Sequence, residues 1–568
     1  MGKILVTAAL PYANGRVHLG HLAGAYLPAD IFVRWRRLKG DDAVFICGSD
    51  EHGVPITLSA LKKKCSPQDI VDEFHALNGA AFAAAGVQFD IWGRTSSPEH
   101  HALSQEFFTK LLAKGYIDTR EIEQYYSEQS KMFLPDRYVE GVCPHCGNAQ
   151  ARGDQCDACG GTYEVTELKE PRCALPGDTS KPVLKPTKHW FLRLDKFQQG
   201  LEAFVAQHKD GAQAWRANAQ RGAEGWLKSG LRARCITRDT EWGVKIPLNE
   251  PGIEGKRLYV WFDAPIGYVT FTQQLFAQRG NADGWRDYWQ NPECPIYNFI
   301  GKDNIPFHAI TWPAMELGYN DAAGGGKPYQ LATQVVANEF LNFGADKFSK
   351  SRGNLIELGW FVEKIGAEPL RYYLNSIAPE DNDSAFTWED FLRKYNGELA
   401  DVIGNFVHRS VTFTHKYFES VIPTGGADGE NEAKFRAEIE AAQVDSAAAL
   451  DGLHFKAAQA RLIELGRAGN KYFDERAPWK QRKESIEACG TTLRVCAEAV
   501  ATLGLALRPF LPVSSAKILA LFGVSEADAV KPGSAGRKGR DLAAPGLKLG
   551  VPEVLYKKIE EKDLPTTE

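Results

Sequence analysis

The chain has 568 residues, of which 44% are hydrophobic and 24% charged, a composition typical of a globular protein with three or four domains. Its formal net charge of −5 argues against a protein that coats nucleic acid non-specifically. Eleven cysteines are too few for a disulfide scaffold, and no apolar run is long enough to span a bilayer, so we expect a cytoplasmic protein with no membrane partner.

The first predicted strand and helix enclose a turn with the features of an anion site. Lys3–Ala8 is short, apolar and rich in β-branched residues, and P-Y-A-N-G at Pro11–Gly15 ends it. In the H-L-G-H that follows, His18 and His21 share one helix face, where both rings can donate to phosphate oxygens beside the N–H groups of the helix start. Gly20 leaves room for a base or ribose to approach the backbone. The alternative is a histidine pair that only satisfies the helix start.

A second strand is predicted at Ala43–Gly48, after a basic amphipathic helix over Ile31–Lys39 that ends near Gly40. Asp50 follows this strand closely. Ligands of parallel sheets bind outside the carboxyl ends of the strands, so Asp50 is a candidate to bind a cationic group. A helix N-cap would explain the same residue without a ligand, and the spacing does not choose between the two.

Four cysteines in two C-x-x-C pairs give a strong local signal. Cys143 and Cys146 precede Cys156 and Cys159 by a spacer of nine residues, within a Gly-, Pro- and Cys-rich stretch from about 114 to 234 that interrupts the strand–helix alternation. Two such pairs facing each other supply a tetrahedral site for zinc, with iron–sulfur or redox pairs as the alternatives. Because the protein supplies all four ligands, the predicted zinc is structural.

The strand pattern returns at Trp242–Ile246, Arg257–Phe262 and Tyr297–Asp303. Aromatic and histidine side chains gather at the ends of these predicted strands, and His308 lies one helical turn before Trp312. This gathering suits a pocket for an apolar, polarizable side chain, although the same rings could belong to the core.

A basic loop is predicted at Asp346–Asn354, D-K-F-S-K-S-R-G-N. Its lysines, serines and arginine can clamp phosphates, whereas such a loop taken alone is usually a solvated turn. No Gly-Lys pair in the chain is followed by Ser or Thr, which excludes a P-loop. No G-x-G-x-x-G opens the first strand, which argues against a dinucleotide enzyme.

Beyond Phe386 the chain is predicted to be helical. Leu392–Phe418, Lys434–Asp451 and Ser485–Leu507 carry apolar residues at three- and four-residue spacing, as in a packed helix bundle. The residues of this part that could face RNA, or could equally cap or pack helices, are Asn405, Arg409 and Trp479.

Together these motifs resemble the methionyl-tRNA synthetases, a family of class I aminoacyl-tRNA synthetases. The resemblance extends to about Ile559 and is carried by P-Y-A-N-G, H-L-G-H, M-F-L-P-D-R-Y at Met132–Tyr138, the cysteine pairs, D-A-P-I-G-Y at Asp263–Tyr268, S-K-S-R-G-N at Ser349–Asn354 and D-E-R-A-P-W at Asp474–Trp479. It implies an α/β fold, with a Rossmann-like parallel-sheet catalytic domain, a zinc-knuckle connective insertion and an all-α anticodon-binding helix bundle. The implied domains are the two catalytic halves at 1–113 and 235–335, the insertion at 114–234, the basic loop and stem-contact region at 336–390, the bundle at 391–550 and a C-terminal tail at 551–568.

The resemblance also implies roles for individual residues. Those implied to bind ATP are His18, Gly20, His21, Lys347, Ser349, Lys350 and Ser351, the two histidines and two lysines acting in catalysis. Those implied to hold methionine are Tyr12, Asp50, Trp261, Ala264, Pro265, Tyr268, His308 and Trp312, with Asp50 on its ammonium group. Asn405, Arg409 and Trp479 would read the CAU anticodon.

The reaction implied is activation of L-methionine by ATP to methionyl-adenylate and pyrophosphate, then transfer of the methionyl group to initiator and elongator tRNA(Met). Mg²⁺ is expected with ATP, and the four paired cysteines would hold a single Zn²⁺. A second zinc is not expected, because Y-S-E-Q-S at Tyr126–Ser130 replaces the second C-x-x-C of some relatives and Cys173 has no cysteine three residues on. Phe348 stands where many family members carry Met, a change that should be tolerated.

The chain stops at Glu568 without the oligonucleotide-binding domain that some relatives use to dimerise. We therefore expect a monomer, or a homodimer if such a module belongs to the full protein. Two other interpretations remain open. A synthetase for leucine, isoleucine or valine would usually carry a large editing domain, for which the stretch 114–234 is small. An inert tRNA-binding protein with a zinc knuckle would keep the fold, but the intact histidines and lysines weigh against it.

Overall fold

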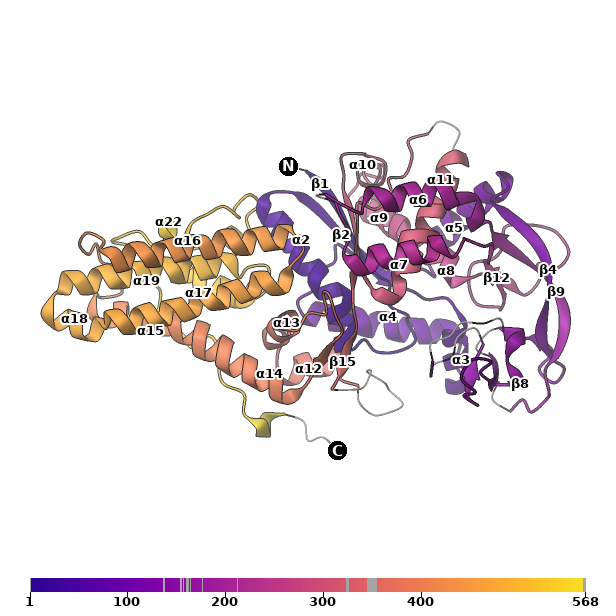
Figure 1. Ribbon diagram of the computed structural model, residues 1–568, viewed down its shortest axis with the longest axis horizontal. Helices are drawn as coiled ribbons and strands as arrows, with labels where there is room; N and C mark the ends of the chain where they lie inside the picture. Colours follow the sequence, from indigo (N-terminus) through magenta and orange to yellow (C-terminus); the bar gives the residue numbers. More distant parts are fainter. Residues whose placement is uncertain are drawn as a thin grey trace.

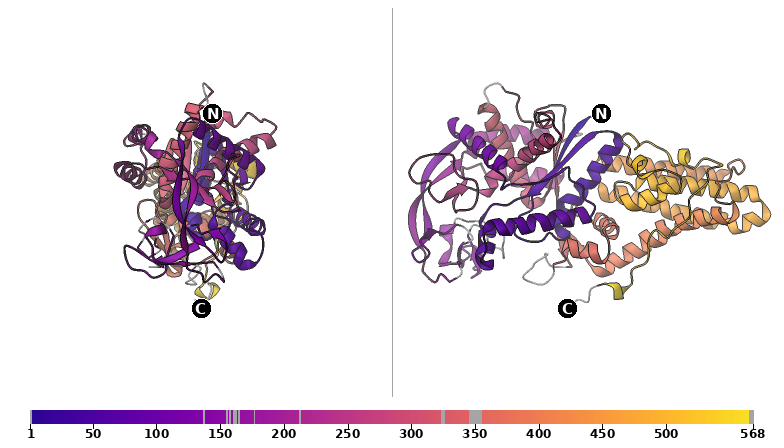
Figure 2. Two further views of the ribbon diagram at one scale, coloured as in Figure 1. Left: turned by 90° about the vertical axis from the view of Figure 1, so that its right-hand side faces the viewer. Right: turned by 180° about the vertical axis from the view of Figure 1, so that it is seen from behind.

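The computed structural model describes residues 2–564 except 136–137, 154–155, 157, 160–162, 164, 176, 212, 323–325 and 345–354. A parallel sheet with helices on both faces lies in the middle of the molecule, between a helix bundle at one end and the long strands Ile117–Ser127 and Val183–Leu192 at the other (Figures 1 and 2). Within the described ranges, no helix is both long and apolar enough to cross a membrane.

The central sheet consists of five parallel strands. They are β1 (Lys3–Ala8), β2 (Asp42–Ser49), β3 (Ile91–Arg94), β13 (Ile296–Gly301) and β14 (Gln334–Asn338). The predicted strands at 3–8 and 43–48 are confirmed, and the one predicted at 297–303 ends at Gly301. The strands stand in the order β14-β13-β1-β2-β3, so the direction of winding reverses between β1 and β13. Parallel sheets open a crevice for ligands at such a reversal.

Helices cover both faces of the sheet because the side chains of β1 alternate. Ile4 and Val6 face one side and Leu5 the other. The first side is covered by α2 (Leu27–Lys39), α4 (Pro67–Ala84) and α13 (Ala367–Ser376). The second side is covered by α5 (Pro98–Ala113), α9 (Ile266–Gln278) and α11 (Trp312–Ala322). As predicted, the helix before β2 ends at Lys39, followed by Gly40 in the left-handed region.

Two glycines allow α9 to pack directly on the strand ends. A Cβ atom at Gly48 would lie 2.5 Å from the ring of Phe271, and one at Gly93 would overlap the same ring. Larger residues there would push α9 away from the sheet.

The stretch between the two halves of the sheet contains longer elements than its composition indicates. Its larger sheet, in the order β10-β9-β4-β5, consists of β4 (Ile117–Ser127), β5 (Met132–Phe133), β9 (Val183–Leu192) and β10 (Arg234–Cys235). Its smaller sheet consists of β6 (Val139–Val142), β7 (Ala151–Arg152) and β8 (Lys169–Cys173). Two helices, α6 (Gln198–Gln207) and α7 (Ala217–Lys228), pack on the α5 side of the central sheet.

The predicted strand at Arg257–Phe262 is wrong in its second half. The strand β12 covers only Lys256–Leu258, and α8 begins at Val260 and ends at Asp263. The predicted strand at Trp242–Ile246 is reduced to a single bridge between Lys245 and Arg257. A short apolar run does not distinguish a buried strand from a buried helical turn, which explains the error.

The remaining short elements of this half are α1 (Leu19–His21), α3 (Val54–Lys63), β11 (Thr237–Asp239), α10 (Arg286–Trp289), β15 (Leu341–Phe343), α12 (Leu358–Lys364) and β16 (Ser384–Phe386). Widened π-helical turns, which often occur at functional sites, lie at Leu22–Tyr26 and Phe307–Thr311.

The bundle is helical, as predicted. Its helices are α14 (Trp388–Lys394), α15 (Asn405–Tyr417), α16 (Glu430–Asp451), α17 (Phe455–Arg476), α18 (Pro478–Glu484), α19 (Ile486–Ala506), α20 (Pro512–Ala520), α21 (Glu526–Ala529) and α22 (Gly539–Leu542), with a π-helix at Tyr395–Gly404. The helix α17 was not among the predicted ones. Its interior glycines lower helix propensity, but they are needed for packing: a Cβ at Gly466 would lie 2.6 Å from Ile403, and one at Gly469 2.5 Å from Phe406.

A buried arginine joins the bundle to the sheet. The Arg371 guanidinium lies 2.7 Å from the carboxylate of Asp30 in α2, and it also donates to the carbonyls of Pro509 and Phe510, after α19. Both side chains of the ion pair are at most 2% exposed. Burial alone would raise the pKa of Asp30, but Arg34 and Arg371 lower it below its ordinary value. Removing one partner of such a buried pair typically costs about 3–5 kcal/mol.

The C-terminal segment runs back along the π-helix of the bundle. Asn396 exchanges two hydrogen bonds with the backbone of Ile559, and the Tyr395 hydroxyl donates to the carbonyl of Lys557 at 3.0 Å. Tyr556 is buried against Gly404. These contacts tie the last described residues to the start of the bundle.

Candidate active site

Backbone hydrogen bonds hold the chain beyond β1 against the chain beyond β2. Tyr12 forms a parallel bridge with Asp50. The Ala13 N–H donates to the carbonyl of Asp50 at 2.8 Å, and the Asp50 N–H donates to that of Pro11 at 2.9 Å. Tyr12 is exposed and the Asp50 side chain is buried. The N-cap of α3 is Gly53, so the alternative in which Asp50 caps this helix is wrong.

The two histidines after β1 form a reciprocal cap at the start of α1. The Nδ1 atom of His18 accepts from the Gly20 N–H, and the Nδ1 atom of His21 accepts from the His18 N–H, both at 3.1 Å. A ring that accepts through Nδ1 and is neutral carries its proton on Nε2. The ring centroids lie 3.8 Å apart, so the two rings lie together at a helix start.

The second predicted motif lies outside the described residues, and with it Lys347, Ser349, Lys350 and Ser351. The residues that flank it can be placed. The Leu19 N–H donates to the carbonyl of Ile356 at 3.2 Å, and the Leu358 N–H donates to the carbonyl of Val17 at 3.0 Å. On the other flank, β15 contacts α1. Both flanks of the motif therefore lie beside the histidine pair.

Tyr268 and His308 form a buried hydrogen-bonded pair at the end of β13. The Tyr268 hydroxyl lies 2.9 Å from Nε2 of His308, and Nδ1 of His308 lies 3.1 Å from the carbonyl of Asn304. Burial lowers the pKa of His308 to about 4, so the ring is neutral, donates from Nδ1 and accepts at Nε2. A neutral, polarizable pair of rings suits an apolar ligand group.

The other residues predicted to line the pocket differ in exposure. Trp261 is 42% exposed, and its ring lies 4.6 Å from that of Phe307. Ala264 is half-buried, and Pro265 is the buried residue before α9. Trp312 is only 2% exposed and packs within the core beside Phe107. We call Tyr12, His18, His21, Asp50, Tyr268 and His308 the strand-end site.

Ionisable side chains to which the sequence analysis assigned no role lie beside Asp50. Burial raises the pKa of Asp50 well above its ordinary value, and the carboxylates of Asp263 and Glu51 raise it further. Glu51 is itself paired with Arg94 at 2.9 Å. Asp263 contacts His52, at a position far away in the sequence. No spacing rule links such distant residues, so only the folded chain identifies them.

The four paired cysteines meet as predicted, beside the smaller sheet of the insertion. The Sγ atoms of Cys143 and Cys159 lie 3.9 Å apart, those of Cys146 and Cys156 3.7 Å apart, and all four lie within 4.8 Å of one another. Zn–S bonds of about 2.3 Å in a tetrahedron place the sulfur atoms about 3.8 Å apart, so the group fits zinc. Gly147 has a φ of +76°, which the turn after the first pair requires.

Of the three predicted anticodon residues, Asn405 and Arg409 belong to α15 and Trp479 to α18, the helix at the far end of the bundle (Figure 1). Asn405 donates to the side-chain oxygen of Asn470 at 3.3 Å. The Arg409 guanidinium lies 2.6 Å from Asp474 and over the ring of Phe473. The ring of Trp479, 38% exposed, lies 6.1 Å from that of Phe473. We call Asn405, Arg409 and Trp479 the bundle-tip site.

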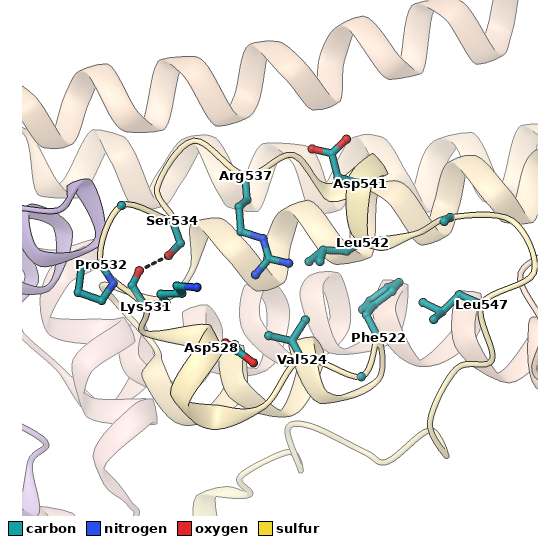
Figure 3. A pocket seen from close by; sticks show the side chains of 13 residues that line it. Phe522, Val524, Asp528, Lys531, Pro532, Ser534, Arg537, Asp541, Leu542 and Leu547 are labelled. Carbon is teal, nitrogen blue, oxygen red and sulfur yellow. Dashed lines mark hydrogen bonds between the residues drawn. The ribbon is translucent and has the colours of Figure 1, made fainter.

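A cavity of about 660 Å³ opens elsewhere in the bundle, lined by residues of α21, α22 and the loops that flank them (Figure 3). Lys531 and Arg537 line it together with the apolar side chains of Phe522 and Leu542. None of its lining residues belongs to the strand-end site or the bundle-tip site.

The whole chain matches known proteins. The family model of the class I tRNA synthetases (M) matches residues 4–411, and that of the anticodon binding domain of methionyl tRNA ligase matches residues 422–567. The methionine–tRNA ligase of Chlorobaculum tepidum is 44% identical over 571 residues, covering 99% of this chain and 80% of the relative. That of Thermococcus kodakarensis is 45% identical over 530 residues, covering 93% and 71%.

The fold has solved counterparts as well. The structure of Mycobacterium tuberculosis methionyl-tRNA synthetase in complex with methionyl-adenylate superposes with a TM-score of 0.80 at 24% identity, covering 98% of this chain and 99% of that one. The free form of the same enzyme gives a TM-score of 0.72 at 23% identity, covering 99% of each chain.

Proposed function

The chain belongs to the methionyl-tRNA synthetase family, and from that premise we propose how its residues divide the work of a methionine–tRNA ligase. The enzyme activates methionine with ATP to methionyl-adenylate and pyrophosphate and then transfers the methionyl group to tRNA(Met). The observation that carries the proposal is the convergence, at the end of β1, of the histidine pair, the buried Asp50 and both flanks of the basic loop.

In the first step a carboxylate oxygen of methionine attacks the α-phosphorus of ATP, and the bond from that phosphorus to the pyrophosphate oxygen breaks. We assign His18 and His21 to the phosphate oxygens, to which their Nε2–H groups donate as charge develops. Lys347 and Lys350 neutralise the departing pyrophosphate, while Gly20, Ser349 and Ser351 complete the ATP site. Positioning and charge neutralisation supply the catalysis, so no protein nucleophile is needed. Magnesium enters with ATP.

The amino acid is held on the other side of the reacting bond. The Asp50 carboxylate accepts the ammonium group, and the Tyr268–His308 pair contacts the thioether. Tyr12, Trp261, Ala264, Pro265 and Trp312 form the rest of the proposed pocket. Because Tyr12 and Trp261 are exposed, they are the residues whose rings a bound methionine would cover.

In the second step a hydroxyl of the terminal ribose of tRNA attacks the carbonyl carbon of the adenylate, and AMP leaves. We propose that the bundle-tip site reads the CAU anticodon of both initiator and elongator tRNA(Met), by stacking on Trp479 and by hydrogen bonds from Asn405 and Arg409. The paired cysteines hold one structural zinc. The domain limits given above, a monomeric state for this chain and a cytoplasmic location belong to the same proposal.

The test is ATP–pyrophosphate exchange with each amino acid in turn. Methionine alone should support rapid exchange. Exchange with leucine, isoleucine or valine but not with methionine would contradict the assignment of the pocket, and no exchange with any amino acid would favour an inert tRNA-binding protein.

A further inference from the structure

Three histidines and an aspartate from three separate segments of the chain lie together close to Asp50. His52 follows β2, His100 and His101 lie in α5, and Asp263 ends α8. Nδ1 of His52 lies 2.5 Å from Oδ2 of Asp263, and Nε2 of His52 lies 3.3 Å from Nε2 of His101. Nε2 of His100 lies 3.5 Å from the same oxygen of Asp263. The side chains of His52, His100 and Asp263 are at most 2% exposed.

Residues of these types can bind a metal, but the distances indicate a shared proton instead. Ligand atoms about 2.0–2.1 Å from a tetrahedral zinc lie about 3.3 Å apart. The 2.5 Å between His52 and Asp263 is too short for two ligands of one ion and places the two groups in hydrogen-bond contact. The cysteine group, whose sulfur atoms are 3.7 Å and 3.9 Å apart in its two closest contacts, shows the opposite geometry.

The proton count of the group follows from its contacts. Nδ1–H of His52 donates to Asp263, and one further proton lies between the Nε2 atoms of His52 and His101. Burial and the neighbouring imidazoles lower the pKa of His101 to about 4, so that ring is neutral. We place the proton between the two rings on His52, because the fully buried carboxylate of Asp263, which its Nδ1 contacts, requires a compensating charge beside it. A histidine that donates from both nitrogens is an imidazolium. This cation offsets Asp263, which is fully buried and whose Oδ1 atom has no hydrogen-bond partner among the described residues.

The link to the substrate is electrostatic. Burial alone would raise the pKa of Asp263, but the positive charge of His52 and hydrogen bonds from His100 and His52 lower it. A carboxylate at Asp263 in turn raises the pKa of Asp50. The ionisable groups that interact directly with His52 or Asp50 are Glu51, His100, His101, Asp263 and Tyr268. Behind these, Cys47, His75, Arg94 and Arg257 interact with one or another of the same five groups.

We propose that His52 is a positioning residue of the amino-acid site: as an imidazolium bound to Asp263, it offsets that carboxylate and so keeps Asp50 ionised opposite the ammonium group of methionine. The same hydrogen bond fixes the chain after β2, which carries Asp50, to the turn before α9, which carries Tyr268. This inference rests on the proposed role of Asp50.

The experiment is a charge-compensation cycle in ATP–pyrophosphate exchange. His52→Gln removes the cation and leaves Asp263 charged, so the acid limb of the KM for methionine should move up by about one pH unit, and below that limb the KM should be about tenfold above the wild-type value at the same pH. The KM for ATP and kcat should change less than twofold. Adding Asp263→Asn to His52→Gln should restore most of the methionine KM, because the uncompensated charge is then gone.

The pH profile separates this role from a structural one. As pH falls, methionine binding is lost when Asp50 takes up a proton. The acid limb of the methionine KM should therefore move to higher pH in His52→Gln and to lower pH in Asp263→Asn. A purely structural role predicts equal weakening of methionine and ATP and no opposite shifts. A double variant as weak as His52→Gln would overturn the proposal.

Two controls keep failures distinguishable. Asp50→Asn tests the underlying assignment: if it leaves the KM for methionine unchanged, the proposed role of Asp50 fails and the inference with it. If Asp50→Asn raises that KM and His52→Gln does not, only the inference fails.

Metal content should stay the same in His52→Gln and wild type, and loss of a bound metal from the variant would show a metal site instead. If His52→Gln does not fold, the pH profile of Asp263→Asn alone decides.

Discussion

The strand-end site and the bundle-tip site are built in different ways. At the strand ends, backbone hydrogen bonds fix His18, His21 and Asp50 before any substrate arrives. At the bundle tip, Arg409 is held by another side chain, Asp474, and Trp479 is partly exposed. Chemistry requires donors that need no reorganisation, whereas recognition of unpaired bases can exchange one side-chain partner for another. The two sites should therefore fail separately, and the following experiments test that separation.

The largest effect is expected from Lys350→Ala. Loss of a cation that neutralises pyrophosphate should lower the rate of adenylate formation about 100- to 1,000-fold, the range seen when one transition-state donor is removed. Methionine binding, measured by equilibrium dialysis without ATP, should be nearly unchanged. Equal loss of both would mean that the lysine supports the structure rather than the reaction.

Trp479→Ala should act only through tRNA. Stacking of a base on an aromatic ring contributes about 1–3 kcal/mol, so kcat/KM for aminoacylation should fall about 5- to 150-fold. The rate of ATP–pyrophosphate exchange should stay at the wild-type value, and Trp479→Phe should retain most of the aminoacylation. Reduced exchange in Trp479→Ala would refute both the anticodon assignment and the separation of the two sites.

Removing zinc should affect the strand-end site more than the bundle. The small core around the cysteines includes Val54, two residues after His52, so its loosening should lower exchange by roughly tenfold. Cys143→Ser should reduce bound zinc from one per chain to near zero by mass spectrometry. Cys173→Ser is the matched control, since Cys173 lies in the same small sheet but outside the cysteine group, and it should retain the metal.

Lowering the pH should reduce the free energy of unfolding through protonation of His308. Its pKa is about 4 in the folded protein and about 6.5 when unfolded, so below pH 6.5 the unfolded chain binds a proton that the folded chain does not. The contribution of His308 to the free energy of unfolding is full above pH 6.5 and falls by at most about 1.4 kcal/mol per pH unit down to pH 4. His308→Gln should flatten this slope in denaturant titrations, and an unchanged slope would contradict the neutral ring.

Local signals were sufficient where one segment specifies its own structure. β1 and β2, the cysteine pairs and the helical character of the bundle follow from patterns within a few residues. The prediction of a strand through Phe262 was wrong because an apolar run fits a strand and a buried helical turn equally well. The helix α17 was not predicted because its glycines lower helix propensity, and the reason for them, close packing against Ile403 and Phe406, lies elsewhere in the chain.

Contacts between distant residues were beyond such reasoning. The pairing of His52 with Asp263 depends on the register in which α8 meets the end of β2, which no short motif encodes. The backbone hydrogen bonds that hold residues 356–358 beside His18 likewise join segments far apart in the sequence, and they form only when the chain has folded.

The guanidinium of Arg371 fixes the position of the bundle relative to the sheet. It binds the carboxylate of Asp30 in α2 and the carbonyls of Pro509 and Phe510 after α19. A change in the angle between the bundle and the sheet would therefore leave a buried cation without its hydrogen-bond partners. Bending the molecule between the sheet and the bundle therefore carries a cost of about 3–5 kcal/mol for this pair alone, and the separation of the two parts should vary little.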